Sequence, residues 1–174
     1  MTPEPSISLH LLPQEVLEAL LADDLSGASR LMGLDLPAFF LDEGWLWDIR
    51  LQQLRRSPTD AGWLVRAAVL EPHRVVVGHA GFHGPPDPAG TVEVGYTVVP
   101  DHRGRGYGHR VLLALLVEAA ASKQVRTVRA SVSPDNVASV KVVTAARFRH
   151  VGEQWDDIDG TELIFERLLE AEIS

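Results

Sequence analysis

The chain has 174 residues, of which 45% are apolar and 23% are charged, which predicts one domain with a full hydrophobic core. Its net charge of −8 argues against a protein whose main partner is nucleic acid, and the absence of cysteine excludes disulfides, thiol catalysis and cysteine-bound zinc. The N-terminus lacks the apolar core of a signal peptide, and no apolar run approaches the roughly 20 residues of a membrane span, so we expect a cytoplasmic protein without a membrane partner.

The first third of the chain predicts one strand followed by helices. Residues 7–12 alternate weakly, as in a strand, and residues 13–56 carry apolar side chains at helical spacing with glycine and proline breaks. We expect two or three helices there. The segment 44–56 holds two of the four tryptophans, and together with residues 37–40 it either fills the core or lines a substrate pocket. We favour the core, because large aromatic side chains supply the most burial.

From Trp63 onward the pattern changes to strands and two long helices. Apolar runs with short connections predict an antiparallel meander, and a strand–helix–strand crossover after it predicts two parallel neighbours. The fold class is therefore α/β, with a mixed antiparallel and parallel central sheet flanked by helices, in a single domain spanning 1–174. The predicted strands are 63–70, 75–84, 91–99, 127–133, 148–155 and 162–169, and the predicted helices are 106–121 and 136–146.

The turn before the first long helix carries the clearest signal for a ligand. Its three glycines, at 104, 106 and 108, alternate with Arg103, Arg105 and Tyr107. Glycine lets backbone N–H groups converge on an anion, and the first turn of a helix adds unpaired N–H donors and a positive dipole end. With the arginines, this pattern predicts a pyrophosphate cradle. Arginines at 110, 126 and 129 place more positive charge in the same part of an acidic chain, which is typical of a small anionic ligand site.

Two better-known phosphate-binding loops are excluded. A Walker loop ends in Gly-Lys-Ser/Thr, and the two lysines of the chain, Lys123 and Lys141, do not occur in that context. A dinucleotide-binding turn follows the first parallel strand of its unit and has an acidic residue after the next strand. Here the turn follows an antiparallel meander, and no acidic residue ends the next strand.

The motifs around this turn resemble those of a known family. An Arg-x-x-Gly-x-Gly turn that opens a helix resembles the acetyl-CoA signature of the GNAT N-acetyltransferase superfamily, and an Asn followed three residues later by Ser resembles the start of its second helix. The strand sequence Glu-x-Gly-Tyr at 93–96 is similar to the branch that contains ribosomal-protein N-terminal acetyltransferases. The resemblance covers about residues 63–168. The positions that carry its two motifs are Arg103, Gly106, Gly108, Asn136 and Ser139.

The resemblance implies that the protein binds acetyl-CoA as a co-substrate and transfers the acetyl group directly to an amine. The strand before the turn would splay from its neighbour, so that the backbone of Thr97 to Val99 pairs with the pantetheine arm and an N–H near Val98 stabilises the oxyanion. The N–H groups of residues 105–109 would hold the pyrophosphate, and the asparagine and serine would lie beside the pantetheine or the leaving sulfur. The implied cofactor-binding residues are Thr97, Val98, Val99, Arg103, Gly104, Arg105, Gly106, Tyr107, Gly108, His109, Asn136 and Ser139.

Glu93 is the candidate catalytic base. An attacking amine with a pKa of about 10 must lose a proton, and a carboxylate acting through water is a suitable acceptor. Strand alternation places Glu93 on one face with Gly95, Thr97 and Val99, where the glycine leaves room for a substrate, and directs the apolar residues between them into the core. The alternative is that Glu93 is a solvated or salt-bridged strand residue.

Two departures from the family pattern leave the general acid unassigned. A tyrosine is common seven positions after the asparagine and is replaced here by Val143, and the usual glycine before Phe148 is replaced by Arg147. The first departure favours an alternative without catalysis, a CoA-sensing or protein-interaction module. A binding protein for another phosphorylated ligand is a third alternative. Asn136 itself has a structural alternative as a helix N-cap, and both of its roles can coexist.

The sequence predicts no metal site. His79 and His83 would lie roughly 13 Å apart along one strand, too far to share an ion. The segment 155–166 resembles a calcium loop only in part, because Trp155 holds the first ligand position, and a hairpin explains it better. The acceptor is an amine, either of a protein N-terminus or of a small molecule. We expect no nucleic-acid partner, and a homodimer stays open.

Overall fold

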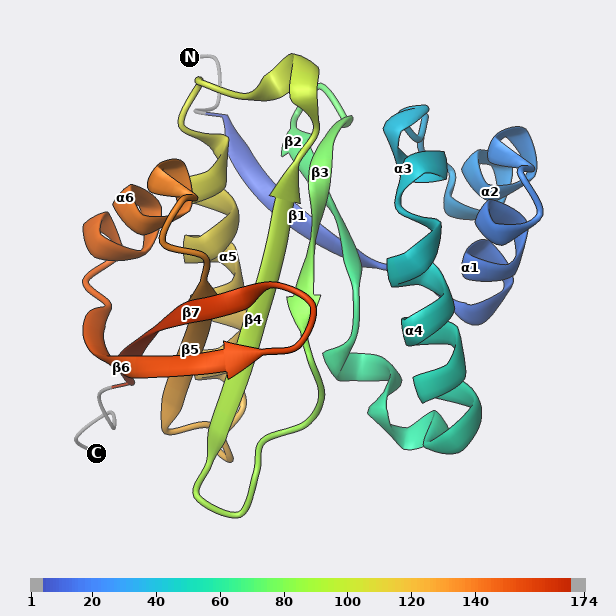
Figure 1. Cartoon of the computed structure of the whole chain (residues 1–174). Coiled ribbons are helices and arrows are strands. Elements are labelled where there is room, and N and C mark those ends of the chain that lie inside the picture. The colour runs from blue at the N-terminus through green and yellow to red at the C-terminus, as the bar shows by residue number, and fades with distance from the viewer. Residues whose placement is uncertain (1–4, 170–174) are drawn as a thin grey trace.

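The computed structural model describes residues 5–169, which form a seven-stranded sheet with helices on both faces (Figure 1). The strands lie in the order β1-β2-β3-β4-β5-β7-β6. Their bounds are β1 Ser6–Leu11, β2 Arg66–Glu71, β3 Val75–Phe82, β4 Thr91–Val98, β5 Thr127–Val132, β6 Arg149–Asp156 and β7 Gly160–Leu168. The helices are α1 Gln14–Leu21, α2 Leu25–Met32, α3 Phe39–Asp42, α4 Gly44–Arg56, α5 Tyr107–Ala121 and α6 Val137–Ala145, with 3₁₀ helices η1 Pro58–Trp63 and η2 Pro100–His102.

The strand pairing confirms the predicted mixed sheet. The strands β1 to β4 form an antiparallel meander, β4 and β5 run parallel, and β6 and β7 form a hairpin whose second strand pairs with β5. The Asp156 carboxylate accepts the backbone N–H groups of Ile158 and Asp159 and so closes the hairpin turn. In Figure 1 the hairpin crosses in front of β4.

Helices cover the two faces of the sheet with separate apolar cores. Behind the sheet in Figure 1, α5 packs against β4, β3 and β1 and is joined by α6, while α1 to α4 lie on the other side, next to β1 to β3. Alternate residues of β2 enter different layers: Ala68 packs in the α5 core, and Ala67 and Val69 pack in the core of α1 to α4. This two-sided burial explains why β2 and β3 read as continuous apolar runs.

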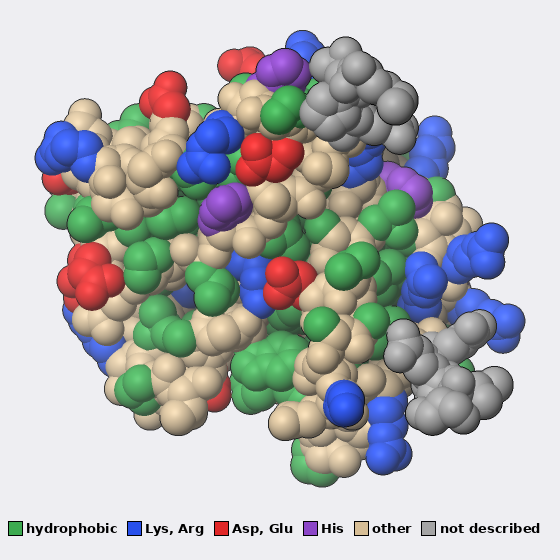
Figure 2. Space-filling model, turned by 180° about the vertical axis from the view of Figure 1, so that it is seen from behind, with side chains coloured by type: hydrophobic (Ala, Val, Ile, Leu, Met, Phe, Trp, Pro, Cys, Tyr) green, Lys and Arg blue, Asp and Glu red, His purple; other side chains and the backbone are tan. Residues whose placement is uncertain are grey.

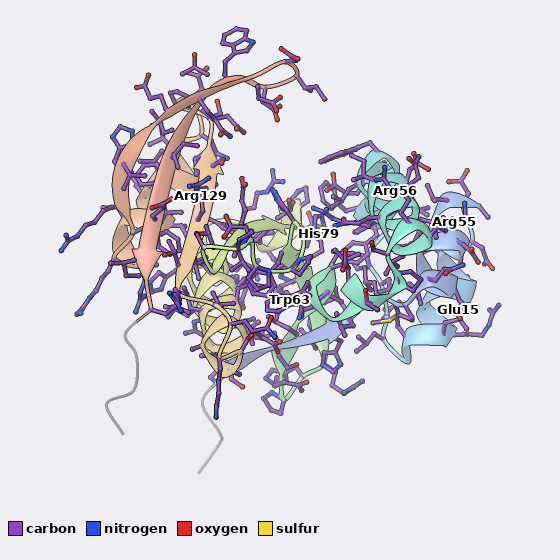
Figure 3. All side chains as sticks on the ribbon, turned by 90° about the horizontal axis from the view of Figure 1, so that it is seen from below. Glu15, Arg55, Arg56, Trp63, His79 and Arg129 are labelled. Atoms are coloured by element: carbon purple, nitrogen blue, oxygen red, sulfur yellow. The ribbon has the colours of Figure 1, made fainter. Side chains whose placement is uncertain are left out.

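The aromatic segment before β2 divides between core and surface. Phe40 and Trp47 are fully buried and pack around His79 of β3, whose Nε2 lies 2.8 Å from Glu43 Oε2. Figure 3 shows His79 at the junction between the sheet and the helices. The predicted core role is therefore confirmed for Phe40 and Trp47. It is wrong for Trp45, which is 63% exposed because it lies on the opposite side of α4.

Two element boundaries also differ from the prediction. The region 13–56 contains four helices instead of two or three, because the Asp24 carboxylate caps α2 and the left-handed Gly33 ends it, and α3 is a single turn. The strand predicted from Trp63 begins only at Arg66, because η1 continues through Trp63. The buried Arg66 guanidinium donates to the carbonyl oxygens of residues 62–64 and holds this turn in place. None of the helices within residues 5–169 has the length and apolar character needed to cross a bilayer.

Candidate functional site

The strands β4 and β5 separate partway along their length. Their parallel pairing covers only three residues of each strand and ends at Glu93 and Arg129. On its other edge β4 stays bonded to β3: the N–H of His83 donates to Glu93 O, and the N–H of Val99 donates to Val77 O. Residues of an antiparallel pair bond their partner alternately, so the backbone N–H and C=O groups of Tyr96 and Val98 point away from β3 into the gap.

A cavity of about 650 Å³ lies on one side of this gap, between the end of β4 and the N-terminal ends of α5 and α6. We call it the α5 cavity. Gly104 and Gly106 line it with left-handed φ angles of 72° and 79°, and no atom lies within 4 Å of the position that a Cβ would take at either residue. Gly106 is the N-cap of α5 and offers no side-chain partner, so the first N–H groups of the helix are free to bind a ligand. This geometry is compatible with the pyrophosphate cradle that the glycine pattern predicts, and we refer to the turn 104–108 as the glycine cradle.

The lining of the α5 cavity suits an anion. Its charged residues are Arg103 and Lys141, and no carboxylate lines it. Seen from behind, Lys and Arg side chains gather along the side of the molecule that carries α6 (Figure 2). Tyr96 and His102 also line the cavity, and the Tyr96 hydroxyl and His102 Nδ1 are the two buried side-chain polar atoms of residues 5–169 without a hydrogen-bond partner. Leaving such an atom unpaired costs about 1–3 kcal/mol, which a polar ligand in the cavity would offset.

Most of the expected cofactor-binding residues meet at this cavity, and two do not. Val99 is 3% exposed, packs in the core of α1 to α4, and gives its N–H to β3. Arg105 lies beside the cavity in sequence but outside its lining. Asn136 caps α6, since its Oδ1 accepts the N–H of Ser139 at 3.1 Å, and it also lines the cavity. The expected residues that line it are Thr97, Val98, Arg103, Gly104, Gly106, Tyr107, Gly108, His109, Asn136 and Ser139.

The expected cluster of arginines does not form. Arg129 pairs with the Glu166 carboxylate of β7 at 2.6 Å, and Arg110 donates to the backbone of Pro5. Of the five arginines between 103 and 129, only Arg103 lines the α5 cavity, and its Nε donates to Val98 O at 3.0 Å. The second positive charge comes from Lys141, which no motif indicated. Closeness of the five arginines in the sequence therefore did not predict how many of them line the α5 cavity.

A second cavity of about 650 Å³ opens on the other side of the gap, between α4, the sheet and the β6–β7 hairpin. We call it the α4 cavity. Trp45 and Ile49 of α4 give it an apolar wall. Its charged lining is mainly acidic, with one arginine and two histidines against three carboxylates. These residues are Arg50, His79, His83, Glu93, Asp159 and Glu162.

Glu93 lies where the two strands separate and faces the α4 cavity. Its Oε1 accepts a 2.6 Å hydrogen bond from Ser131 Oγ of β5 and lies 3.7 Å from His83 Nδ1. Glu93 is thus neither fully solvated nor paired with an arginine. No sequence pattern linked Ser131 or His83 to Glu93, because these residues meet it only through strand pairing.

The space above Gly95 is filled by His83. A Cβ on Gly95 would lie 3.0 Å from His83 Nε2, so the glycine makes room for the imidazole, whereas the sequence predicted room for a substrate. Burial lowers the pKa of His83; Glu93 acts in the opposite direction, and Arg50 lowers the pKa further. Together these effects favour the neutral form of the imidazole.

The two cavities meet at the gap in the sheet. Four residues line both of them: Tyr96 and Thr97 of β4, and Asn136 and Ser139 at the start of α6. A ligand in one cavity can therefore contact a ligand in the other at this junction. In the described part of the chain, no three His, Asp or Glu residues are close enough to hold a metal ion.

Comparisons with known proteins agree with this geometry. Residues 38–149 match the family described as "Acetyltransferase (GNAT) domain". A ribosomal-protein-S5-alanine acetyltransferase from Vibrio fischeri has a similar structure, with a TM-score of 0.66, 17% identity, and coverage of 97% of this chain and 95% of that one. No curated protein sequence matches the chain.

Two further structures with the same fold are named for different substrates. A spermidine/spermine N-acetyltransferase from Vibrio cholerae gives a TM-score of 0.64 at 13% identity, and an aminoglycoside acetyltransferase in complex with coenzyme A gives 0.62 at 16%. Each comparison covers 94% of this chain and 95% of the other. The family match spans more than half of the chain and includes the glycine cradle, β4 and the start of α6; the chain therefore belongs to the GNAT acetyltransferase family.

Proposed function

We propose that the protein transfers an acetyl group from acetyl-CoA, held in the α5 cavity, directly to a primary amine held in the α4 cavity. The observation that carries this proposal is the pair of cavities with opposite charge that meet at the open edge of β4. A phosphorylated donor matches the cationic lining of the first, and an ammonium ion matches the carboxylates of the second. Coenzyme A in an aminoglycoside acetyltransferase of the same fold is consistent with this assignment.

The glycine cradle binds the donor in this proposal. The N–H groups of the first turn of α5 and the dipole of this helix would hold the pyrophosphate, and Arg103 and Lys141 would add charge. The free N–H of Val98 faces the gap and would donate to the thioester oxygen as negative charge develops there. The thioester supplies an activated acetyl group, so no covalent bond to the protein is needed.

Glu93 would take the proton of the amine, directly or through a water molecule. Ser131 donates a hydrogen bond to one of its oxygens, which orients the carboxylate within the lining of the α4 cavity. General-base catalysis of this kind contributes about 10²–10⁴-fold in rate. The contribution depends on the acceptor: an alkylamine with a pKa of about 10.4 needs the base more than an α-amino group with a pKa of about 8.

The acceptor is either a protein N-terminus or a small-molecule amine. The three carboxylates favour a cationic acceptor of either kind, and the wall formed by Trp45 and Ile49 offers apolar contact for the rest of the molecule. Proteins of the same fold are named for both kinds of substrate, a ribosomal protein in one case and the polyamines spermidine and spermine in another. Acetyl transfer therefore has to be tested with both peptide N-termini and small-molecule amines.

The test measures the release of CoA thiol from acetyl-CoA with alkylamines, polyamines and short peptides that carry free or blocked N-termini. We expect at least one class to stimulate release, and Glu93→Gln to reduce kcat about 10²–10⁴-fold with unchanged affinity for acetyl-CoA. Glu153→Gln is the matched control, because Glu153 is exposed on β6 and lines neither cavity. Tight acetyl-CoA binding without thiol release for any amine would favour a CoA-sensing module and overturn the catalytic proposal.

A further inference from the structure

The junction of the two cavities determines where the reacting atoms must lie. If acetyl-CoA occupies the α5 cavity and the amine occupies the α4 cavity, the thioester has to be reached from both. Only the four shared residues, Tyr96, Thr97, Asn136 and Ser139, line both cavities. The leaving sulfur must therefore depart among these four side chains.

Three of these side chains carry a hydroxyl, and one hydroxyl stands apart. The Tyr96 hydroxyl is buried and has no hydrogen-bond partner. The hydroxyls of Thr97 and Ser139 are not among the buried polar atoms that lack a partner. The ring of Tyr96 packs against the start of α5, where a Cβ on Gly108 would lie 3.8 Å from it. Tyr96 therefore contributes to the junction a side chain with a buried hydroxyl that has no hydrogen-bond partner.

The helix α6 does not supply such a group. Val143 occupies the position where the family resemblance implies a tyrosine, and its side chain is fully buried. Lys141 of the same helix lines the α5 cavity but not the α4 cavity, so it is not at the junction. A donor for the leaving sulfur therefore has to come from β4 or from the start of α6.

We propose that Tyr96 is the residue that stabilises the leaving group, by donating its hydroxyl hydrogen to the CoA sulfur. This inference rests on the proposed function. In the step, the amine nitrogen forms a bond to the acetyl carbon, the C–S bond breaks, and the electron pair stays on sulfur. The amine proton leaves toward Glu93, the Tyr96 proton stays on its oxygen as a hydrogen bond, and the thiolate takes a proton from solvent when it leaves.

The acidity of Tyr96 agrees with a hydrogen-bond role. Burial raises the pKa of Tyr96, and the nearby Ser139 side chain acts in the opposite direction without completing a hydrogen bond to the hydroxyl. A thiol has a pKa of about 8.5 and is therefore the stronger acid. The proton consequently remains on Tyr96 throughout the neutral range, where it can stabilise negative charge on sulfur without being consumed.

The test is Tyr96→Phe, which removes the hydroxyl and keeps the ring. We expect kcat to fall about 10- to 100-fold, in line with the loss of one donor to a developing charge, while the KM for acetyl-CoA stays unchanged. We also expect the free protein to melt at the same temperature or higher, because the hydroxyl has no partner to lose. A purely structural role for the hydroxyl predicts a lower melting temperature.

An equilibrium measurement separates this role from general damage to the enzyme. Calorimetry at a pH of about 9, where a thiol is mostly ionised, compares CoA with desulfo-CoA. We expect the wild type to bind CoA more tightly than desulfo-CoA, and we expect the ratio of the two Kd values to be about tenfold smaller in Tyr96→Phe. The matched control is Thr144→Val, which removes another hydroxyl of the region, exposed on α6 and outside both cavities. It should behave as the wild type does.

Three results would overturn the inference. Tyr96→Phe could keep the wild-type kcat and preference for CoA, or Ser139→Ala could remove both while Tyr96→Phe keeps them, which would assign the donor to Ser139. If the wild type binds neither acetyl-CoA nor CoA, the proposed function fails and the role of Tyr96 fails with it. Normal turnover of the wild type with an unchanged Tyr96→Phe variant refutes the role of Tyr96 alone.

Discussion

The glycine cradle gives the sharpest prediction, because both its strain and its open space are defined. Gly106 has a φ of 79°, and nothing lies within 4 Å of a Cβ placed on it. A residue with a side chain in this conformation costs about 1–2 kcal/mol, so Gly106→Glu should lower the melting temperature of the free protein by roughly 2–8 °C. Its carboxylate would extend into the space that we assign to the pyrophosphate and repel it.

Melting curves with acetyl-CoA, CoA and ADP provide the assay. A ligand at about 100 times its Kd stabilises the folded wild type by about 2.7 kcal/mol, which raises the melting temperature by roughly 5–10 °C for a chain of this length. We expect acetyl-CoA and CoA to produce this shift in the wild type and to lose it in Gly106→Glu. A protein built for another phosphorylated ligand would instead respond to ADP as well as it does to CoA.

A second glycine supplies a control for strain and charge. Gly33 ends α2 with a φ of 62°, has open space at its Cβ position, and lines neither cavity. Gly33→Glu should therefore lower the melting temperature of the free protein by a similar amount and keep the full shift with acetyl-CoA. If Gly106→Glu also keeps the full shift, the cradle does not bind the pyrophosphate and the reasoning is refuted.

Two further predictions concern stability. Trp47 is fully buried between Phe40 and His79, so Trp47→Ala should cost about 3–5 kcal/mol in chemical denaturation, whereas Trp45→Ala, at an exposed position of the same helix, should cost less than about 1 kcal/mol. Because burial lowers the pKa of His83, the unfolded chain binds a proton more readily there, and the unfolding free energy should decrease as the pH falls below about 6.5. His83→Gln should reduce this decrease in melts between pH 7.5 and 5; a steeper decrease would contradict the direction of the shift.

The sequence indicated the features that depend on a few neighbouring residues. The spacing of apolar residues and the positions of turn residues predicted the strands, the two long helices and the closing hairpin. These elements form from local alternation and helical spacing. The cradle was predictable for the same reason: its glycines and the start of α5 are contiguous in the chain. The N-cap role of Asn136 spans only three residues, and the structure confirms it.

Features that depend on distant segments could not be predicted. The imidazole next to the Glu93 carboxylate belongs to His83 of the neighbouring strand segment. The hydroxyl that donates a hydrogen bond to this carboxylate belongs to Ser131, 38 residues along the chain. The pairing of Arg129 with Glu166 spans 37 residues and removes one of the five expected arginines from the site. Lys141 and the unpaired hydroxyl of Tyr96 gain their significance only from the cavity that they line.

The sequence by itself therefore determined the family, the order of the elements and the cradle, since each follows from local patterns of glycine, charge and apolar spacing. Only the tertiary structure decided which side chains surround the junction, because their positions depend on how β4 separates from β5 after Glu93 and on which elements close the two cavities. Strand separation and cavity closure are properties of packing between segments far apart in the chain. The residues of one short segment do not determine them.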